Sequence, residues 1–246
     1  MSDAPVAVVT GAAGQIGRRL LDAFADQGYP VVGLDLPDAL PAGDDRFVAR
    51  DLTDAEQVRA VVGGLGRIDV LVHNAGLSAI GGFEDHDVTT HAAVLAVNYL
   101  GPVALTQAAL PALRAARGRV VVMGSVAGFA PVVGRPAYVG SKHAVTGLFE
   151  ALRPELARDG VGVTLVHPTF VTGGMSEAAG RVEGRGRSTT GQRVTPEDVA
   201  SAVVEAVDRG RDRVLVGRTA RLSWHVHRLA PRLYVHLMTR RLKDTP

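Results

Sequence analysis

Seven short, almost wholly apolar runs alternate with longer segments of helical pattern along this chain of 246 residues. A strand that is apolar along its whole length is buried on both faces, and such strands belong to parallel sheets with helices on either side. The alternation therefore predicts a single α/β domain with a Rossmann-like, doubly wound parallel sheet. The expected strands are 5–10, 31–35, 46–51, 68–73, 119–123, 161–166 and 213–216.

Helical patterns fill the intervals between these runs. Helices are expected at 18–27, from Thr53 or Asp54 to Leu65, at 88–116, around Tyr138, and after Thr195. Thr53 or Asp54 is the expected cap of the second helix. Pro154 falls inside the helix that carries Tyr138, and a proline there removes a backbone hydrogen bond, so the helix should kink or end at that point.

The composition excludes several classes of protein. The apolar stretches are too interrupted by charges, glycine and proline to span a bilayer, and no linker divides the chain. Cysteine is absent, which excludes disulfides and thiolate metal sites, and we expect no bound metal. The first residues lack a basic segment followed by an apolar core, so no signal peptide and a cytoplasmic location are expected.

A glycine turn joins the first strand to the first helix. Glycines at 11, 14 and 17 let the backbone approach a pyrophosphate and direct the positive end of a helix at it. Asp35 ends the second strand, where a carboxylate can accept hydrogen bonds from a ribose diol. It would repel a 2′-phosphate, and no basic residue follows it directly, so NAD is expected in preference to NADP.

Two side chains with proton chemistry follow the fifth strand. Tyr138 and Lys142 stand four residues apart, on one face of any helix that carries them. A nearby ammonium stabilises a phenolate, so we expect Lys142 to lower the pKa of Tyr138. Ser125 stands at the carboxyl end of the strand, where α/β sheets place their ligands.

Together these motifs resemble the short-chain dehydrogenase/reductase family, in its single-domain branch, over residues 5 to about 217. The segment from Thr10 to Gly17 resembles the cofactor turn of that family. Asp51 and Leu52 resemble its adenine contact, and the run 74–76 resembles the turn after its fourth strand. The cofactor contacts that the resemblance implies are Gly11, Gly14, Gln15, Ile16, Gly17, Asp35, Asp51, Leu52, Asn74, Ala75, Gly76, Tyr138, Lys142, Pro168 and Thr172.

The resemblance also implies a catalytic set of Asn98, Ser125, Tyr138 and Lys142. Tyr138 would exchange a proton with the substrate oxygen while hydride passes to or from the nicotinamide. Lys142 would activate Tyr138 and bond to the nicotinamide ribose, and Ser125 would orient the substrate oxygen. Asn98 would hold a water that links Lys142 to bulk solvent.

The chain departs from the family pattern at two positions near the cofactor. Gln15 stands where the single-domain branch has its middle glycine, which is expected to alter the pyrophosphate contacts without abolishing binding. Thr169 replaces the glycine that usually follows the proline of the nicotinamide-side loop. The segment 173–193, rich in glycine and arginine, is expected to act as a lid over the substrate.

Residues 218–246 are expected to form a basic, amphipathic, helical extension of the domain at 1–217. The extension holds six Arg and one Lys against one Asp, or +6, while the whole chain carries +2. Pro231 is expected to start a second helix or kink the first. We expect the apolar face to pack on the substrate opening or a sister subunit; an anionic membrane surface is the alternative. That face carries Leu222, Val226, Leu229, Leu233 and Leu237, with Trp224 and Tyr234 as bulky neighbours at an interface.

The sequence thus predicts an NAD-dependent oxidoreductase that interconverts a secondary alcohol and a ketone. The alternative is a regulatory protein that binds a dinucleotide on the same fold without turnover. The resemblance implies a homodimer or homotetramer acting on a small molecule. No nucleic-acid partner is expected, because the positive charge is confined to the extension and no recognition motif accompanies it.

Overall fold

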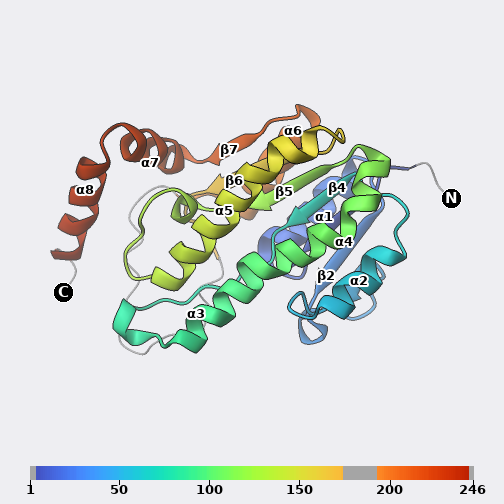
Figure 1. Cartoon of the computed structure of the whole chain (residues 1–246), viewed down its shortest axis with the longest axis horizontal. Helices are drawn as coiled ribbons and strands as arrows, with labels where there is room; N and C mark the ends of the chain where they lie inside the picture. Colours follow the sequence, from blue (N-terminus) through green and yellow to red (C-terminus); the bar gives the residue numbers. More distant parts are fainter. Residues whose placement is uncertain (1–3, 174–192, 244–246) are drawn as a thin grey trace.

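A single parallel sheet of seven strands forms the centre of the molecule (Figure 1). The computed structural model describes residues 4–173 and 193–243. The strands lie in the order β3-β2-β1-β4-β5-β6-β7, and the chain order reverses between β1 and β4, at the crevice where such sheets bind ligands. The strands are β1 (Ala7–Thr10), β2 (Val31–Asp35), β3 (Phe47–Ala49), β4 (Val70–His73), β5 (Arg119–Met123), β6 (Gly162–Pro168) and β7 (Arg213–Val216).

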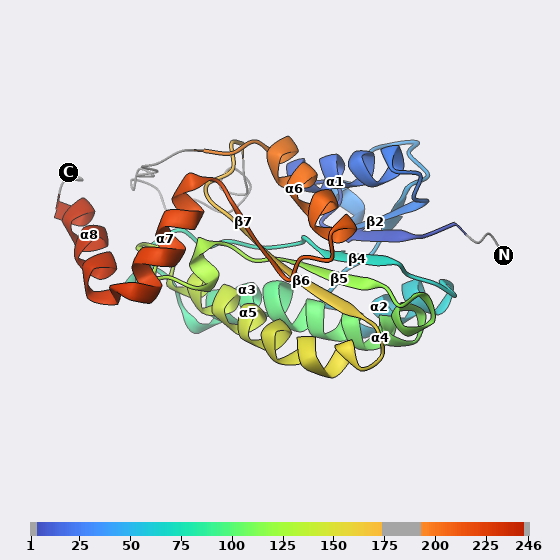
Figure 2. The ribbon, with the colours of Figure 1, turned by 90° about the horizontal axis from the view of Figure 1, so that it is seen from above.

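Helices cover both faces of the sheet, as the apolar strands predict (Figure 2). On one face α1 (Gln15–Asp26) and α6 (Pro196–Asp208) pack through residues such as Phe24 and Val203. On the other face lie α2 (Ala55–Gly63), α4 (Gly101–Ala116) and α5 (Pro136–Ala157), with Leu105 and Phe149 fully buried. The predicted Rossmann-like α/β fold is confirmed.

Two predicted helix starts match the structure and one does not. Asp54 caps α2, accepting hydrogen bonds from two backbone N–H groups of the first turn. Thr195 and Asp198 form a capping box at α6. The first helix starts at Gln15 rather than at residue 18, because Gly14 already has the extended backbone of a cap residue.

Pro154 is expected to kink or end its helix. It does not end the helix, because α5 continues to Ala157. Only the last turn lies beyond the proline, so a single backbone hydrogen bond is missing there. That turn is held by the buried side chain of Leu156 and by the N–H groups of Asp159 and Val161, which both donate to the Leu156 carbonyl. Core packing thus offsets the lost bond.

The long apolar helix predicted at 88–116 is present, and it contains one wide turn. It runs as α3 (Val88–Leu95), a π-turn (Ala96–Leu100) and α4. Contrary to the expectation that the apolar stretches are too interrupted to span a bilayer, this stretch could cross a membrane by length and composition, a test that core helices of soluble proteins also pass. In the structure its α4 part contributes Leu105, Ala109 and Leu113 to the core. Short 3-10 turns occur at Pro37–Ala39, Phe83–Asp85 and Val126–Gly128.

After β7 the chain forms two further helices, α7 (Arg218–Leu229) and α8 (Pro231–Lys243). Pro231 is the first residue of α8, which confirms that it starts a second helix. The two helices leave the body at one end of the sheet, and α8 stands away from it (Figures 1 and 2). The leucines do not pack on the substrate opening, since Leu222, Leu229, Leu233 and Leu237 are all exposed, and packing on a sister subunit stays a prediction.

Candidate active site

The glycine turn after β1 is pressed against its neighbours so closely that side chains do not fit. At Gly11, whose φ is +62°, an added Cβ would lie 2.6 Å from the Cα of Ala75. At Gly17 it would lie 2.2 Å from the Gly11 carbonyl oxygen. The turn therefore presents bare backbone at the start of α1, which fits a pyrophosphate group.

Asn74 ties this turn to the end of β4. Its side-chain amide donates to the carbonyl oxygens of Thr10 and Gly11, both at 3.0 Å. In return the Thr10 hydroxyl accepts from the backbone N–H groups of Asn74 and Ala75, also at 3.0 Å. The run 74–76 thus lies beside the turn, as expected, and Asn74 holds the turn in shape.

Asp35 lies at the edge of the same turn. Its carboxylate accepts from the backbone N–H of Ala13 at 2.8 Å and from that of Leu36 at 2.9 Å. A carboxylate offers about four acceptor positions, so two remain for a diol. Arg18 is also close, because its Nε donates to the Ala13 carbonyl oxygen at 2.8 Å.

The two residues predicted to contact adenine stand just after β3. Asp51 accepts from the backbone N–H of Thr53 at 2.8 Å and from its hydroxyl at 2.7 Å. Leu52 is partly buried against the core. The turn of Asp51 and Leu52 thus lies on the Asp35 side of the sheet, where β3 pairs with β2.

Gln15 bridges the glycine turn and the segment that follows β6. An added Cβ at Gly173 would lie 2.3 Å from the Gln15 Oε1 atom, so the amide rests directly against this glycine. A glycine at position 15 has no side chain that could make this contact. The Gln15 side chain, which departs from the family pattern, therefore connects two chain segments. The next residue, Ile16, is partly buried on α1.

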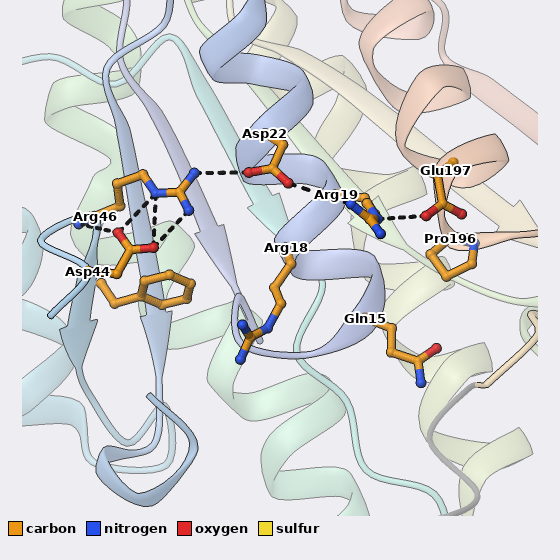
Figure 3. Close-up of a pocket in the computed structure, with 9 residues that line it drawn as sticks. Gln15, Arg18, Arg19, Asp22, Asp44, Arg46, Pro196 and Glu197 are labelled. Atoms are coloured by element: carbon orange, nitrogen blue, oxygen red, sulfur yellow. Dashed lines mark hydrogen bonds and ion pairs between the residues drawn. The ribbon is translucent and has the colours of Figure 1, made fainter. Parts of the chain in front are cut away.

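Figure 3 shows a separate hollow of about 390 Å³ over the outer side of α1. Its charges are largely balanced: Arg19 pairs with Glu197 at 2.6 Å, and Arg46 pairs with Asp44 at 2.7 Å and Asp22 at 3.0 Å. These side chains are at least a quarter exposed, so water screens the ion pairs and they stabilise the fold little. We assign no function to this hollow.

Ser125, Tyr138 and Lys142 come together at the carboxyl edge of the sheet. Ser125 follows β5 and starts the 3-10 turn at Val126–Gly128, while Tyr138 and Lys142 lie one turn apart on α5, both buried. The Ser125 hydroxyl lies close enough to the Tyr138 phenol to act on its pKa. The Lys142 ammonium donates to the Met123 carbonyl oxygen at 2.7 Å and lies 5.7 Å from the Tyr138 ring centre.

The electrostatics of this group differ from the sequence-based expectation. Burial raises the pKa of Tyr138 above its ordinary value of 10, while the Ser125 hydroxyl and the charge of Arg135 oppose that rise. Burial also lowers the pKa of Lys142 from 10.5 to about 8. The net shift of the Tyr138 pKa is therefore opposite to the direction expected from Lys142, because the ammonium is directed at Met123 and burial dominates; activation of Tyr138 by Lys142 stays a prediction.

Asn98 sits in the π-turn and positions α5, the helix that carries Tyr138 and Lys142. Its Nδ2 donates to the Ser141 hydroxyl at 2.8 Å and to the Leu77 carbonyl oxygen at 2.9 Å, and its Oδ1 accepts from the Leu77 N–H at 2.7 Å. Ser141 in turn donates to the Tyr138 carbonyl oxygen at 2.9 Å. Both N–H groups of the amide are thus used within the protein, and water held by this side chain remains a prediction.

Sequence reasoning missed two residues around the catalytic group. Arg135 precedes α5, lies with its guanidinium 5.8 Å from the Phe170 ring centre, and acts on Tyr138 through its charge. Its spacing of three residues from Tyr138 was the available signal. Burial lowers the pKa of His167 to about 4, so its ring is neutral; its Nδ1 must then donate to the Ser125 carbonyl oxygen, at 3.0 Å.

The segment after β6 is anchored to β7 through Thr169. The Thr169 N–H donates to the Val216 carbonyl oxygen at 3.1 Å, and a Cβ added at Gly217 would lie 2.8 Å from the Thr169 Cγ2 atom. The threonine methyl group thus fills space that Gly217 leaves. Pro168 ends β6, and the Thr172 N–H donates to Val194 at 2.9 Å. The expected lid lies mostly outside the described residues.

This chain is similar to the proteins of one known family. The model of the short chain dehydrogenase family matches residues 5–183. The chain belongs to this family. It is 34% identical to "Dehydrogenase/reductase SDR family member 7B" of Xenopus laevis, over 98% of this chain and 82% of the relative. It is 31% identical to "Dehydrogenase/reductase SDR family protein 7-like" of Anopheles gambiae, over 96% and 82%.

Solved structures of the family agree with the fold. A short chain dehydrogenase from Burkholderia cenocepacia J2315 in complex with NADP superposes with a TM-score of 0.85, at 26% identity, over 96% of this chain and 97% of that one. A short chain dehydrogenase/reductase from Burkholderia phymatum in complex with NAD gives 0.74, at 26%, over 92% and 95%. This short-chain dehydrogenase is thus an oxidoreductase that uses a nicotinamide dinucleotide.

The charge of Arg135 leads to a prediction about the pH dependence of this short-chain dehydrogenase. In Arg135→Met the pKa of Tyr138 should rise further, because the variant lacks the cation that opposes the effect of burial. The pH at which the rate of alcohol oxidation rises, set by ionisation of Tyr138 to the phenolate, should move to higher values, with a several-fold lower rate at pH 7. Arg158→Met, an exposed arginine that follows the same helix, is the control. An unshifted profile would contradict the assignment.

Proposed function

We propose that the protein interconverts a secondary alcohol and a ketone, with the substrate carbonyl or hydroxyl oxygen placed between Ser125 and Tyr138. The observation that supports this most is the grouping of buried Tyr138 and Lys142 with Ser125, which acts on the pKa of Tyr138, at the sheet edge that also carries the glycine turn. Buried groups with displaced pKa values at such an edge are typical of acid–base catalysis. A moderately apolar small molecule is the expected substrate.

The chemistry follows from these donors. In reduction, Tyr138 donates its phenolic proton to the carbonyl oxygen as the carbonyl carbon accepts a hydride, and in oxidation it takes the proton back. A bound nicotinamide ring supplies or accepts that hydride. The Ser125 hydroxyl donates to the same oxygen, while His167 holds the Ser125 backbone in place. Lys142 offers an ammonium for the nicotinamide ribose and stabilises the phenolate once a ligand draws it from Met123.

Turnover distinguishes this proposal from a regulator that binds the dinucleotide without reaction. The protein is incubated with NAD or NADP and a panel of secondary alcohols, and with the reduced cofactors and matched ketones, while the absorbance of the reduced nicotinamide is followed. We expect turnover with at least one apolar pair. Cofactor binding with no turnover across the panel would favour the regulator.

NAD is proposed as the preferred cofactor because the Asp35 carboxylate borders the turn where the adenosine ribose would lie. Asp35→Asn removes the charge and keeps an acceptor for the Ala13 N–H, so the ratio of NADP to NAD affinity should rise about tenfold, or ~1.4 kcal/mol. Titration calorimetry with both cofactors measures the ratio. Asp38→Asn, at an exposed carboxylate three residues on, should leave it unchanged. Tighter binding of NADP than NAD by the unaltered protein would refute the preference.

We further propose a homodimer or homotetramer in the cytoplasm, as the family resemblance implies. The mass in solution, measured by light scattering with size-exclusion chromatography, tests the assembly. A monomer at micromolar concentration would contradict it.

A further inference from the structure

The two C-terminal helices contact the body of the enzyme through a small set of residues. Ala220 is fully buried, and the Trp224 ring packs edge-on against Phe129 at 4.9 Å, with the Arg213 guanidinium 4.3 Å from its centre. Tyr234 of α8 is also buried and lies 5.3 Å from the His227 ring of α7. These contacts fix one side of the helix pair and leave the other side to solvent.

The solvent side of α7 and α8 carries large apolar side chains. Five are 43–82% exposed: Leu222, Leu229, Leu233, Val235 and Leu237. On α7 the exposed residues fall at positions 218, 221, 222, 225, 228 and 229, the spacing of one helix face. On α8, Leu233 and Leu237 lie one turn apart. The structure therefore leaves uncovered the face that the sequence pattern marks as apolar.

The same surface is uniformly basic. No Asp or Glu occurs from Arg213 through Lys243. Exposed arginines flank the exposed leucines at positions 218, 221, 228, 232 and 240. A partner for this surface must therefore accept apolar side chains and positive charge together.

We propose that α7 and α8 dock on an anionic phospholipid bilayer. The exposed leucines enter the boundary between headgroups and acyl chains, and the flanking arginines bind the phosphate and carboxylate groups of the lipids. A second copy of this surface is a poorer partner, because pairing two such faces would bring like charges together with no acid between Arg213 and Lys243 to offset them. A nucleic acid would satisfy the arginines but leave the leucines in water.

Flotation of the full chain with lipid vesicles tests this proposal. We expect binding to vesicles of phosphatidylcholine mixed with phosphatidylserine, and a loss of binding to phosphatidylcholine alone or at high salt, because the headgroup contacts are screened. The double variant Leu229→Ser with Leu233→Ser should bind about tenfold more weakly. The control, Val88→Ser with Leu100→Ser, alters side chains that are 82% and 53% exposed on another surface and should bind as the unaltered protein does.

Trp224 is the only tryptophan, so its fluorescence reports whether α7 stays packed in each variant. Unchanged emission with weaker flotation supports the membrane surface. The proposal fails if the unaltered chain does not float with the anionic vesicles, or if both double variants lose binding equally. If the unaltered chain does not float, its mass in solution is compared with that of the leucine variant. A lower mass for the leucine variant alone would assign the surface to contact between copies.

Discussion

Replacing Tyr138 by phenylalanine should lower kcat by about 10²–10⁴-fold, because the variant lacks the only proposed group that exchanges a proton with the substrate oxygen. The ring itself stays, so the buried packing around position 138 is conserved. Steady-state rates with a responsive alcohol measure the loss of kcat, and the cofactor Kd shows whether the cofactor site is retained.

The matched control for this substitution is Tyr29→Phe. Tyr29 is a tyrosine at the opposite end of the sheet, just before β2, where its ring packs against Phe24. That variant should retain the rate of the unaltered enzyme. Turnover that persists in Tyr138→Phe at a near-normal rate would remove the proposed proton donor.

Lys142→Met should abolish most of the activity and at the same time change the pH dependence of stability. Burial holds the pKa of Lys142 at about 8 in the folded protein, against 10.5 when exposed. The folded state therefore binds this proton less tightly, so the stability of the unaltered protein rises as pH increases from about 8 to 10.5. Below pH 8 the buried charge costs about 3 kcal/mol, a cost that the methionine variant lacks.

Urea unfolding at pH 7.5 and at pH 9.5 tests this linkage. The stability difference between Lys142→Met and the unaltered protein should shift in favour of the unaltered protein as the pH rises. Tyr138→Phe retains Lys142, so it should keep this contribution to the pH dependence of the unaltered protein. A difference between Lys142→Met and the unaltered protein that does not vary with pH would show that the ammonium is not buried as described.

The fold was predictable because its signals are local. Apolar runs between turns identified the strands, and caps such as Asp54 and Thr195 identified helix starts, since each depends on residues within one turn of the chain. The spacing of Tyr138 and Lys142 placed them on one face of α5. Such features need no knowledge of how distant segments meet.

The errors arose where distant segments decide the outcome. The direction of the Tyr138 pKa shift depends on how deeply the ring is buried and on where the Lys142 ammonium points. The ammonium points at the carbonyl oxygen of Met123, which lies on β5 and is distant in sequence. Likewise, periodicity identified the helices of the C-terminal extension but not the side that packs. That side is selected by Phe129 and Arg213, which meet Trp224 only in the folded protein.

The π-turn at Ala96–Leu100 shows that part of the site depends on the number of residues in a helix as well as on their identity. A π-turn holds one residue more than an α-turn, so it acts as a single-residue insertion that resets the rotation of everything after it. Deleting one residue there would let α3 and α4 join as a regular helix. Each residue turns a helix by about 100°, so the deletion would rotate the Asn98 amide out of line with Ser141 or turn Leu105 from the core.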